Sequence, residues 1–90
     1  MDDKDLEKLK SFYDKDGKLK QYPKKHTLRL IILDKIASSF EINKEYTEKE
    51  VNEIIKENIS FNDIEYIRRE LIETHLLNRL IDGSKYWKEK

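Results

Sequence analysis

Residues 47–88, TEKEVNEIIKENISFNDIEYIRRELIETHLLNRLIDGSKYWK, decide the fold of this chain. Thr47 and Glu50 have the spacing of a capping box, in which each side chain accepts a hydrogen bond from the other residue's backbone N–H at the start of a helix. Apolar residues then recur on one helix face, at Val51, Ile54, Ile55 and Ile59. This pattern predicts a helix over 48–58.

A second helix is predicted to start near Asn62–Asp63, because either residue can act as an N-cap, and to run to about Thr74. We expect its inward stripe to consist of Ile64, Ile67, Leu71 and His75. Its outward face carries Tyr66, Arg69, Glu70 and Glu73.

A change of pattern follows the second helix. Asp82-Gly83 separates residues 76–81 from residues 84–88, and Asp-Gly supplies the positive φ values that a two-residue type I′ turn requires. These residues therefore predict a β-hairpin, to which Glu45-Tyr46 could add a short third strand. Because Tyr86 and Trp87 alternate along the hairpin, one should face the core and the other solvent.

Three segments precede this stretch. Residues 2–13 place apolar side chains at helical spacing and predict a short helix, with its stripe at Leu6, Leu9, Phe12 and Tyr13. Residues 18–23 alternate like an extended segment, and Pro23 stands at or just before the start of a helix. Residues 24–40 predict the central helix, where apolar residues recur every four positions at Leu28, Ile32, Ile36 and Phe40.

The order helix, helix, helix, hairpin is that of the winged helix. We therefore expect a mainly α (α+β) chain, a winged-helix-like domain of three to four helices with a C-terminal β-hairpin wing. Residues 1–90 are expected to form a single domain, in which an N-terminal helix and turn (1–16) precede a winged-helix-like body (17–90).

Composition excludes several classes of protein. Leu, Ile, Val and Phe make up 25 of the 90 residues, more than the roughly 20% typical of disordered chains, and 19 basic residues balance 19 acidic ones. The absence of cysteine excludes disulfides and thiolate zinc sites. The acidic start at residues 1–5 differs from a signal peptide, and the longest apolar run, 30–33, is too short for a membrane span. We expect a cytoplasmic protein without a membrane partner.

No catalytic or metal-binding constellation is visible in the sequence. His26 and His75 lie far apart and lack a spaced metal-ligand partner, and Gly17 and Gly83 are isolated, so no glycine-rich loop could hold a phosphate. We therefore expect no enzyme, no cofactor and no metal.

Basic residues point to nucleic acid instead, because clustered Lys and Arg neutralise phosphates and release counterions. The candidate nucleic-acid-binding residues are Lys24, Lys25, Arg29, Arg68, Arg69, Arg79 and Lys85. Two observations weigh against this interpretation. The second helix of the pair, 62–75, has a net charge of −2, and Arg68 could instead pair with a carboxylate such as Glu50 or Glu53.

The alternative partner is a protein, because charge is segregated along the chain. Residues 17–36 carry a net charge of +5 and residues 41–75 a net charge of −5. The acidic block could meet a basic partner or the basic block of a second copy. A protein–protein interaction module that keeps the winged-helix frame is therefore the second functional hypothesis.

The runs Asp16-Gly17-x-Leu19-x-x-x-Pro23-Lys24-Lys25 and Tyr46-Thr47-Glu48-x-Glu50-Val51-Asn52 resemble the bacterial domain of unknown function 2087. Arg68-Arg69-Glu70-Leu71, Leu77-x-Arg79 and Asp82-Gly83-Ser84-x-Tyr86-Trp87 fit the same family, so the similarity covers about residues 12–88. Members of that family look like small winged-helix domains, alone or behind a helix-turn-helix domain, and are often labelled transcriptional regulators. The resemblance implies a bacterial cytosolic regulatory protein.

The same resemblance singles out ten positions of this chain, namely Lys24, Lys25, Tyr46, Glu50, Asn52, Arg68, Arg69, Arg79, Tyr86 and Trp87. One departure is visible. The family usually shows a His and an Asp shortly before the Arg-Arg pair, whereas this chain has Asp63 but no His within residues 58–63. Any role that requires that His does not carry over.

Overall fold

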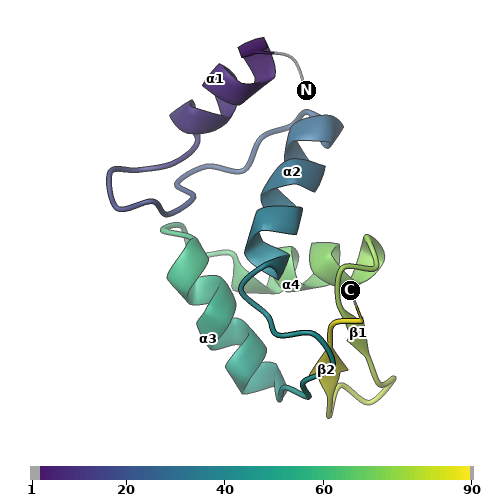
Figure 1. Cartoon of the computed structure of the whole chain (residues 1–90). Coiled ribbons are helices and arrows are strands. Elements are labelled where there is room, and N and C mark those ends of the chain that lie inside the picture. Colours follow the sequence, from purple (N-terminus) through teal and green to yellow (C-terminus); the bar gives the residue numbers. More distant parts are fainter. Residues whose placement is uncertain (1–2, 90) are drawn as a thin grey trace.

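The computed structural model describes residues 3–89, apart from the side chains of Asp3, Asp5 and Leu6. Within that part of the chain, four helices precede a two-stranded antiparallel sheet (Figure 1). The helices are α1 (Asp3–Ser11), α2 (His26–Ala37), α3 (Glu48–Asn58) and α4 (Ile64–Glu73), and the strands are β1 (Asn78–Arg79) and β2 (Tyr86–Trp87). This mainly helical α+β architecture has the winged-helix-like layout that the sequence predicts.

Helices α3 and α4 meet at a steep angle below the end of α2, and the hairpin lies beside the N-terminal end of α3 (Figure 1). Buried apolar side chains from α2, α3, α4, β2 and the connecting segments form one core. Helix α1 lies at the opposite end of the molecule from the hairpin (Figure 1). Its Leu9, with Phe12 and Tyr13 just after it, packs against that core; the predicted contribution of Leu6 lies outside the described side chains.

The capping box predicted for α3 is present. The Thr47 hydroxyl accepts the Glu50 N–H at 3.1 Å, and the Glu50 carboxylate accepts the Thr47 N–H at 2.9 Å. These bonds hold the pKa of Glu50 below its usual value, because the backbone N–H stabilises the ionised form. The helix occupies residues 48–58 as predicted, with Val51 and Ile55 buried.

Helix α2 is shorter than predicted at both ends. It begins at His26, with Lys25 as an extended N-cap residue, so Lys24 and Lys25 precede the first helical turn. It ends at Ala37, where the Ser38 hydroxyl donates to the Lys35 carbonyl and so competes with continuation of the helix. Phe40 is still buried, although it lies beyond the helix.

The end of α4 corrects two details of the prediction. His75 is exposed rather than part of the inward stripe, because the chain leaves the helix at Thr74 and His75 takes a left-handed φ of 62°. Leu77 becomes the buried residue there, and its N–H donates to the Leu71 carbonyl at 3.1 Å. At the other end of α4, Asp63 occupies the N-cap position but makes no side-chain cap hydrogen bond.

The hairpin forms, but its connection is not a two-residue type I′ turn. The two strands are joined by residues 80–85, and of Asp82 and Gly83 only Gly83 has a positive φ, at 75°. The Asp82 carboxylate instead accepts the Ser84 N–H at 2.9 Å, as in an Asx turn. Leu80 accepts the Gly83 N–H and closes the turn.

Tyr46 adds the expected third strand contact to the hairpin. Tyr46 and Tyr86 exchange two backbone hydrogen bonds of 2.8 Å as an antiparallel bridge. Tyr86 is buried and Trp87 is half-buried, so the prediction that one of them faces the core is confirmed. The hairpin is therefore fixed to the segment that leads into α3.

We expect Thr47→Ala to lower the free energy of unfolding by roughly 1 kcal/mol, because the variant loses the side-chain acceptor at the start of α3. Urea unfolding followed by circular dichroism measures the change. Thr27→Ala, which replaces an exposed threonine in the first turn of α2, is the matched control and should cause no comparable loss. Equal effects of the two substitutions would contradict the role assigned to the cap.

Candidate functional site

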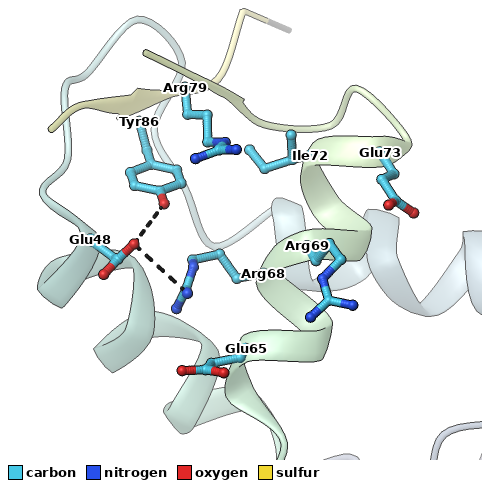
Figure 2. Close-up of a pocket in the computed structure, with 8 residues that line it drawn as sticks. All are labelled: Glu48, Glu65, Arg68, Arg69, Ile72, Glu73, Arg79 and Tyr86. Atoms are coloured by element: carbon cyan, nitrogen blue, oxygen red, sulfur yellow. Dashed lines mark hydrogen bonds and ion pairs between the residues drawn. The ribbon is translucent and has the colours of Figure 1, made fainter. Parts of the chain in front are cut away.

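A pocket of about 490 Å³ opens between the first turn of α3, one face of α4 and the hairpin (Figure 2). Its walls carry three arginines, three glutamates, one tyrosine and one aliphatic residue. They are Arg68, Arg69, Arg79, Glu48, Glu65, Glu73, Tyr86 and Ile72. Of the seven predicted nucleic-acid-binding residues, the structure thus brings three arginines together.

Helix α4 supplies Arg68, Arg69 and Ile72 because Ile67 and Leu71 turn the other side of the helix into the core. Neighbours at i and i+4 lie one turn apart on the same face, which places Arg68 beside Ile72. The side chain of Arg68 is only 18% exposed, since its stem runs along this apolar face before its guanidinium reaches the pocket.

Glu48 connects the helices to the hairpin at the inner wall of the pocket. Its carboxylate Oε1 accepts the Tyr86 hydroxyl at 3.0 Å and lies 3.7 Å from Arg68 Nη2 (Figure 2). Nη1 of the same guanidinium donates to the Asn52 side-chain carbonyl on α3. Arg68 therefore has carboxylate and amide partners on α3, but the carboxylate belongs to Glu48 rather than to Glu50 or Glu53.

Burial raises the pKa of the Tyr86 hydroxyl above its ordinary value, and the hydrogen bond to Glu48 adds to the rise. The guanidinium groups of Arg68 and Arg79 partly oppose the shift, because they favour the ionised phenolate. Tyr86 is thus a neutral hydroxyl at physiological pH, and its proton is donated to Glu48 Oε1 at the wall of the pocket.

Arg69 and Arg79 differ from Arg68 in having no internal partner. Both are exposed, and neither makes a hydrogen bond or an ion pair to any residue within 3–89. Figure 2 shows Arg79 extending from the hairpin over the pocket and Arg69 on the outer side of α4, apart from the group around Glu48. These two guanidinium groups remain available to an anion from outside.

Arg29 is instead held within the fold. Its Nε donates to the Pro23 carbonyl at 2.6 Å, and its guanidinium lies 4.8 Å from the centre of the Tyr22 ring. Nη1 also donates to the Tyr66 hydroxyl at 3.3 Å and lies 3.9 Å from the Glu70 carboxylate. These contacts join the start of α2 to α4, so they assign Arg29 a stabilising role.

The three candidate lysines lie outside the pocket. Lys24 and Lys25 are exposed at the start of α2, which lies well away from the hairpin in Figure 1. Lys85 is in the hairpin connection and pairs with Glu45 at 2.9 Å. A phosphate that bound Lys85 would therefore have to replace a carboxylate.

Sequence reasoning missed Glu48 as a member of the site, and it singled out Asn52 only through the family resemblance. Glu48 stands directly after the N-cap residue and Asn52 lies one turn further, so both share the face of α3 toward α4. That spacing was visible in the sequence. The contacts of these residues with Arg68 and Tyr86 were not, because they span 16 to 38 positions of the chain.

Residues 3–89 contain neither a metal-binding cluster nor a membrane-spanning helix. No group of three or more His, Asp or Glu side chains there could hold a metal ion. No helix in the same part of the chain has the length and apolar character needed to cross a membrane.

Fold and pocket together define a small, mainly helical α+β protein with an arginine-lined pocket beside its C-terminal hairpin. Residues 18–88 match the family described as "Uncharacterized protein conserved in bacteria (DUF2087)", and the chain belongs to that family. The resemblance seen in the sequence is thereby confirmed. Comparison with curated proteins and with solved structures gave no match. Helix α1 lies before the matched region.

Replacing Arg29 with Gln should lower the free energy of unfolding by about 2 kcal/mol, because a charged hydrogen bond and a cation–π contact are lost together. Thermal and urea unfolding measure the change. Lys24→Gln removes a cation from the same end of the domain and is the matched control. If the two variants unfold alike, Arg29 does not hold α2 against α4.

Proposed function

We propose that this domain is a cytoplasmic, nucleic-acid-binding regulatory module, not an enzyme, that contacts duplex DNA chiefly through its phosphates. One observation carries the proposal. Arg69 on α4 and Arg79 on β1 present two exposed guanidinium groups, without an internal partner among the described residues, on the helix and wing of a winged-helix-like frame. In such frames the helix before the wing faces the DNA groove while neighbouring groups reach the backbone.

The seven candidate residues contribute unequally under this proposal. Arg69 and Arg79 are the principal phosphate ligands, and Lys24 and Lys25 form a second basic site at the start of α2. Lys85 contributes only when its pair with Glu45 opens. Arg29 and Arg68 support the interface by holding α4 in place, since their guanidinium groups already have partners within the domain.

The charge of α4 predicts that the contact is weak and unselective. Glu65 and Glu73 line the pocket beside Arg69, and a groove-facing helix is ordinarily neutral or basic. Repulsion between these carboxylates and the phosphates must be offset by the arginines. Binding should therefore fall steeply with salt, with each phosphate contact accounting for about 0.9 in the log–log slope.

We expect Arg69→Glu with Arg79→Glu to weaken binding to a random-sequence duplex at least tenfold and to reduce the salt slope by about 1.8, because two phosphate contacts disappear. Fluorescence anisotropy at several salt concentrations measures both. Lys8→Glu with Lys10→Glu changes the net charge by the same amount on α1 and should have a much smaller effect. Lys24→Glu with Lys25→Glu should also weaken binding, and an unchanged affinity would remove the start of α2 from the interface.

A second candidate function is protein–protein interaction, which is supported by the exposed apolar residues at the tip of the wing. Ile81 is 99% exposed and Leu80 is 41% exposed, and both lie in the hairpin connection. An apolar wing tip beside an acidic helix face suits a basic, partly apolar protein surface better than a phosphate backbone. If the unmodified domain does not bind duplex DNA even at low salt, this second function replaces the first.

A further inference from the structure

Three polar side chains of the pocket reach the same place beside Gly83. A Cβ atom built on Gly83 would lie 3.8 Å from Glu48 Oε1, 4.0 Å from Arg79 Nη1 and 4.0 Å from the Tyr86 hydroxyl. A side chain at this position would thus be in ordinary van der Waals contact with the guanidinium, hydroxyl and carboxylate groups, which the missing side chain of Gly83 leaves uncovered. Figure 2 shows Arg68 reaching from α4 toward the Glu48 carboxylate.

The donors around this point exceed the acceptors that the protein supplies. Arg68 and Arg79 bring two full positive charges, and each guanidinium carries five N–H donors. Glu48 Oε1 is the one carboxylate oxygen within 4 Å of either arginine among residues 3–89, and at 3.7 Å from Arg68 it lies beyond normal hydrogen-bond distance. Glu65 and Glu73 line the outer wall without forming an ion pair to either group. The inner pocket therefore retains unfilled guanidinium donors, because two arginines meet a single carboxylate there, although the whole lining holds three arginines and three glutamates.

Two of the three donors, Arg68 and Tyr86, are also held in position before any ligand arrives. Asn52 accepts a hydrogen bond from Arg68 and fixes the plane of its guanidinium, while the buried ring of Tyr86 fixes its hydroxyl. Groups ordered in advance lose little conformational entropy on binding, which favours affinity for a small ligand. Arg79 alone would have to be ordered by the ligand.

From this arrangement we propose that the pocket binds the terminal phosphate of a small phosphorylated ligand between Arg68, Arg79 and the Tyr86 hydroxyl. A phosphomonoester carries close to two negative charges at neutral pH and three terminal oxygens, which match two guanidinium groups and one hydroxyl. Glu48 competes with the phosphate for the Tyr86 hydroxyl, because the hydroxyl donates its hydrogen bond to Glu48 until a phosphate oxygen takes the place of the carboxylate. The pocket volume of about 490 Å³ leaves room for an organic part against Ile72 and the Tyr86 ring.

The phosphate site goes beyond DNA binding and does not depend on it, whereas the effect of the ligand on DNA binding described below rests on the proposed function. Duplex DNA presents phosphodiesters with a single charge along an outer face, whereas the inner pocket suits a terminal dianion. Arg79 belongs to both surfaces, so a bound ligand would neutralise one of the two principal DNA contacts. The ligand would then act as an effector that weakens the contact between the wing and DNA.

The test is an NMR titration of the isotope-labelled full chain without DNA, followed through the side-chain Nε–Hε signals of Arg68 and Arg79. The probes are inorganic phosphate, phenyl phosphate, phenol and dimethyl phosphate. We expect saturable shifts with the two phosphates, tighter binding of phenyl phosphate than of inorganic phosphate, and no response to phenol. Dimethyl phosphate that binds as tightly as phenyl phosphate would overturn the proposal, since the pocket would then be an ordinary phosphodiester contact.

Variants distinguish direct contacts with the ligand from a general effect of the protein's charge. Arg79→Gln should lower the affinity for phenyl phosphate at least tenfold, and Tyr86→Phe should lower it severalfold. Glu48→Gln should raise the same affinity severalfold, because it removes the competing carboxylate. Misfolding cannot produce such a gain. Lys49→Gln, which removes a neighbouring exposed cation on α3 outside the pocket, should leave affinity within about twofold. A domain that binds duplex DNA but shows no saturable response to either phosphate would overturn the phosphate pocket and leave the DNA proposal standing.

Discussion

Tyr86 joins the parts of this domain that would otherwise be independent. Its ring is buried in the core, its backbone exchanges two hydrogen bonds with Tyr46, and its hydroxyl donates to Glu48 at the start of α3. A two-residue strand has little stability by itself, so the hairpin depends on these anchors. The same residue therefore holds the wing against the helices and forms one wall of the arginine pocket.

The architecture explains why Arg79 lines the same pocket as Arg68 and Arg69, although about ten positions of the chain separate it from them. Burial of Ile67 and Leu71 directs Arg68 and Arg69 away from the core, and the Tyr86 anchor brings Arg79 over them. Glu48 reduces the repulsion among the arginines by forming an ion pair with Arg68. Because this carboxylate lies at the N-terminus of α3, the helix dipole also favours its charge. The pocket thus holds equal numbers of arginines and glutamates, of which only Arg68 and Glu48 form an ion pair.

Local patterns predicted much of this fold. The capping box and apolar stripe gave the bounds of α3, and Asp82-Gly83 located the hairpin. The errors arose where short-range hydrogen bonds compete with periodicity: Ser38 ends α2 early, and Asp82 forms a six-residue connection by accepting the Ser84 N–H. The arginines were predicted individually, but Glu48 and the Tyr86 hydroxyl were not, because their pairing depends on how α3 and the hairpin approach each other.

Leu19 gives the core a consequence for how the chain folds. Its N–H donates to the Asn58 carbonyl and its carbonyl accepts the Ser60 N–H, both at 2.8 Å, and its side chain is completely buried. This pairing joins segments about forty positions apart, so a long loop containing α2 and α3 must close before the contact is gained. Although most of the domain is helical, its folding rate should therefore be limited by this late, non-local closure rather than by helix formation.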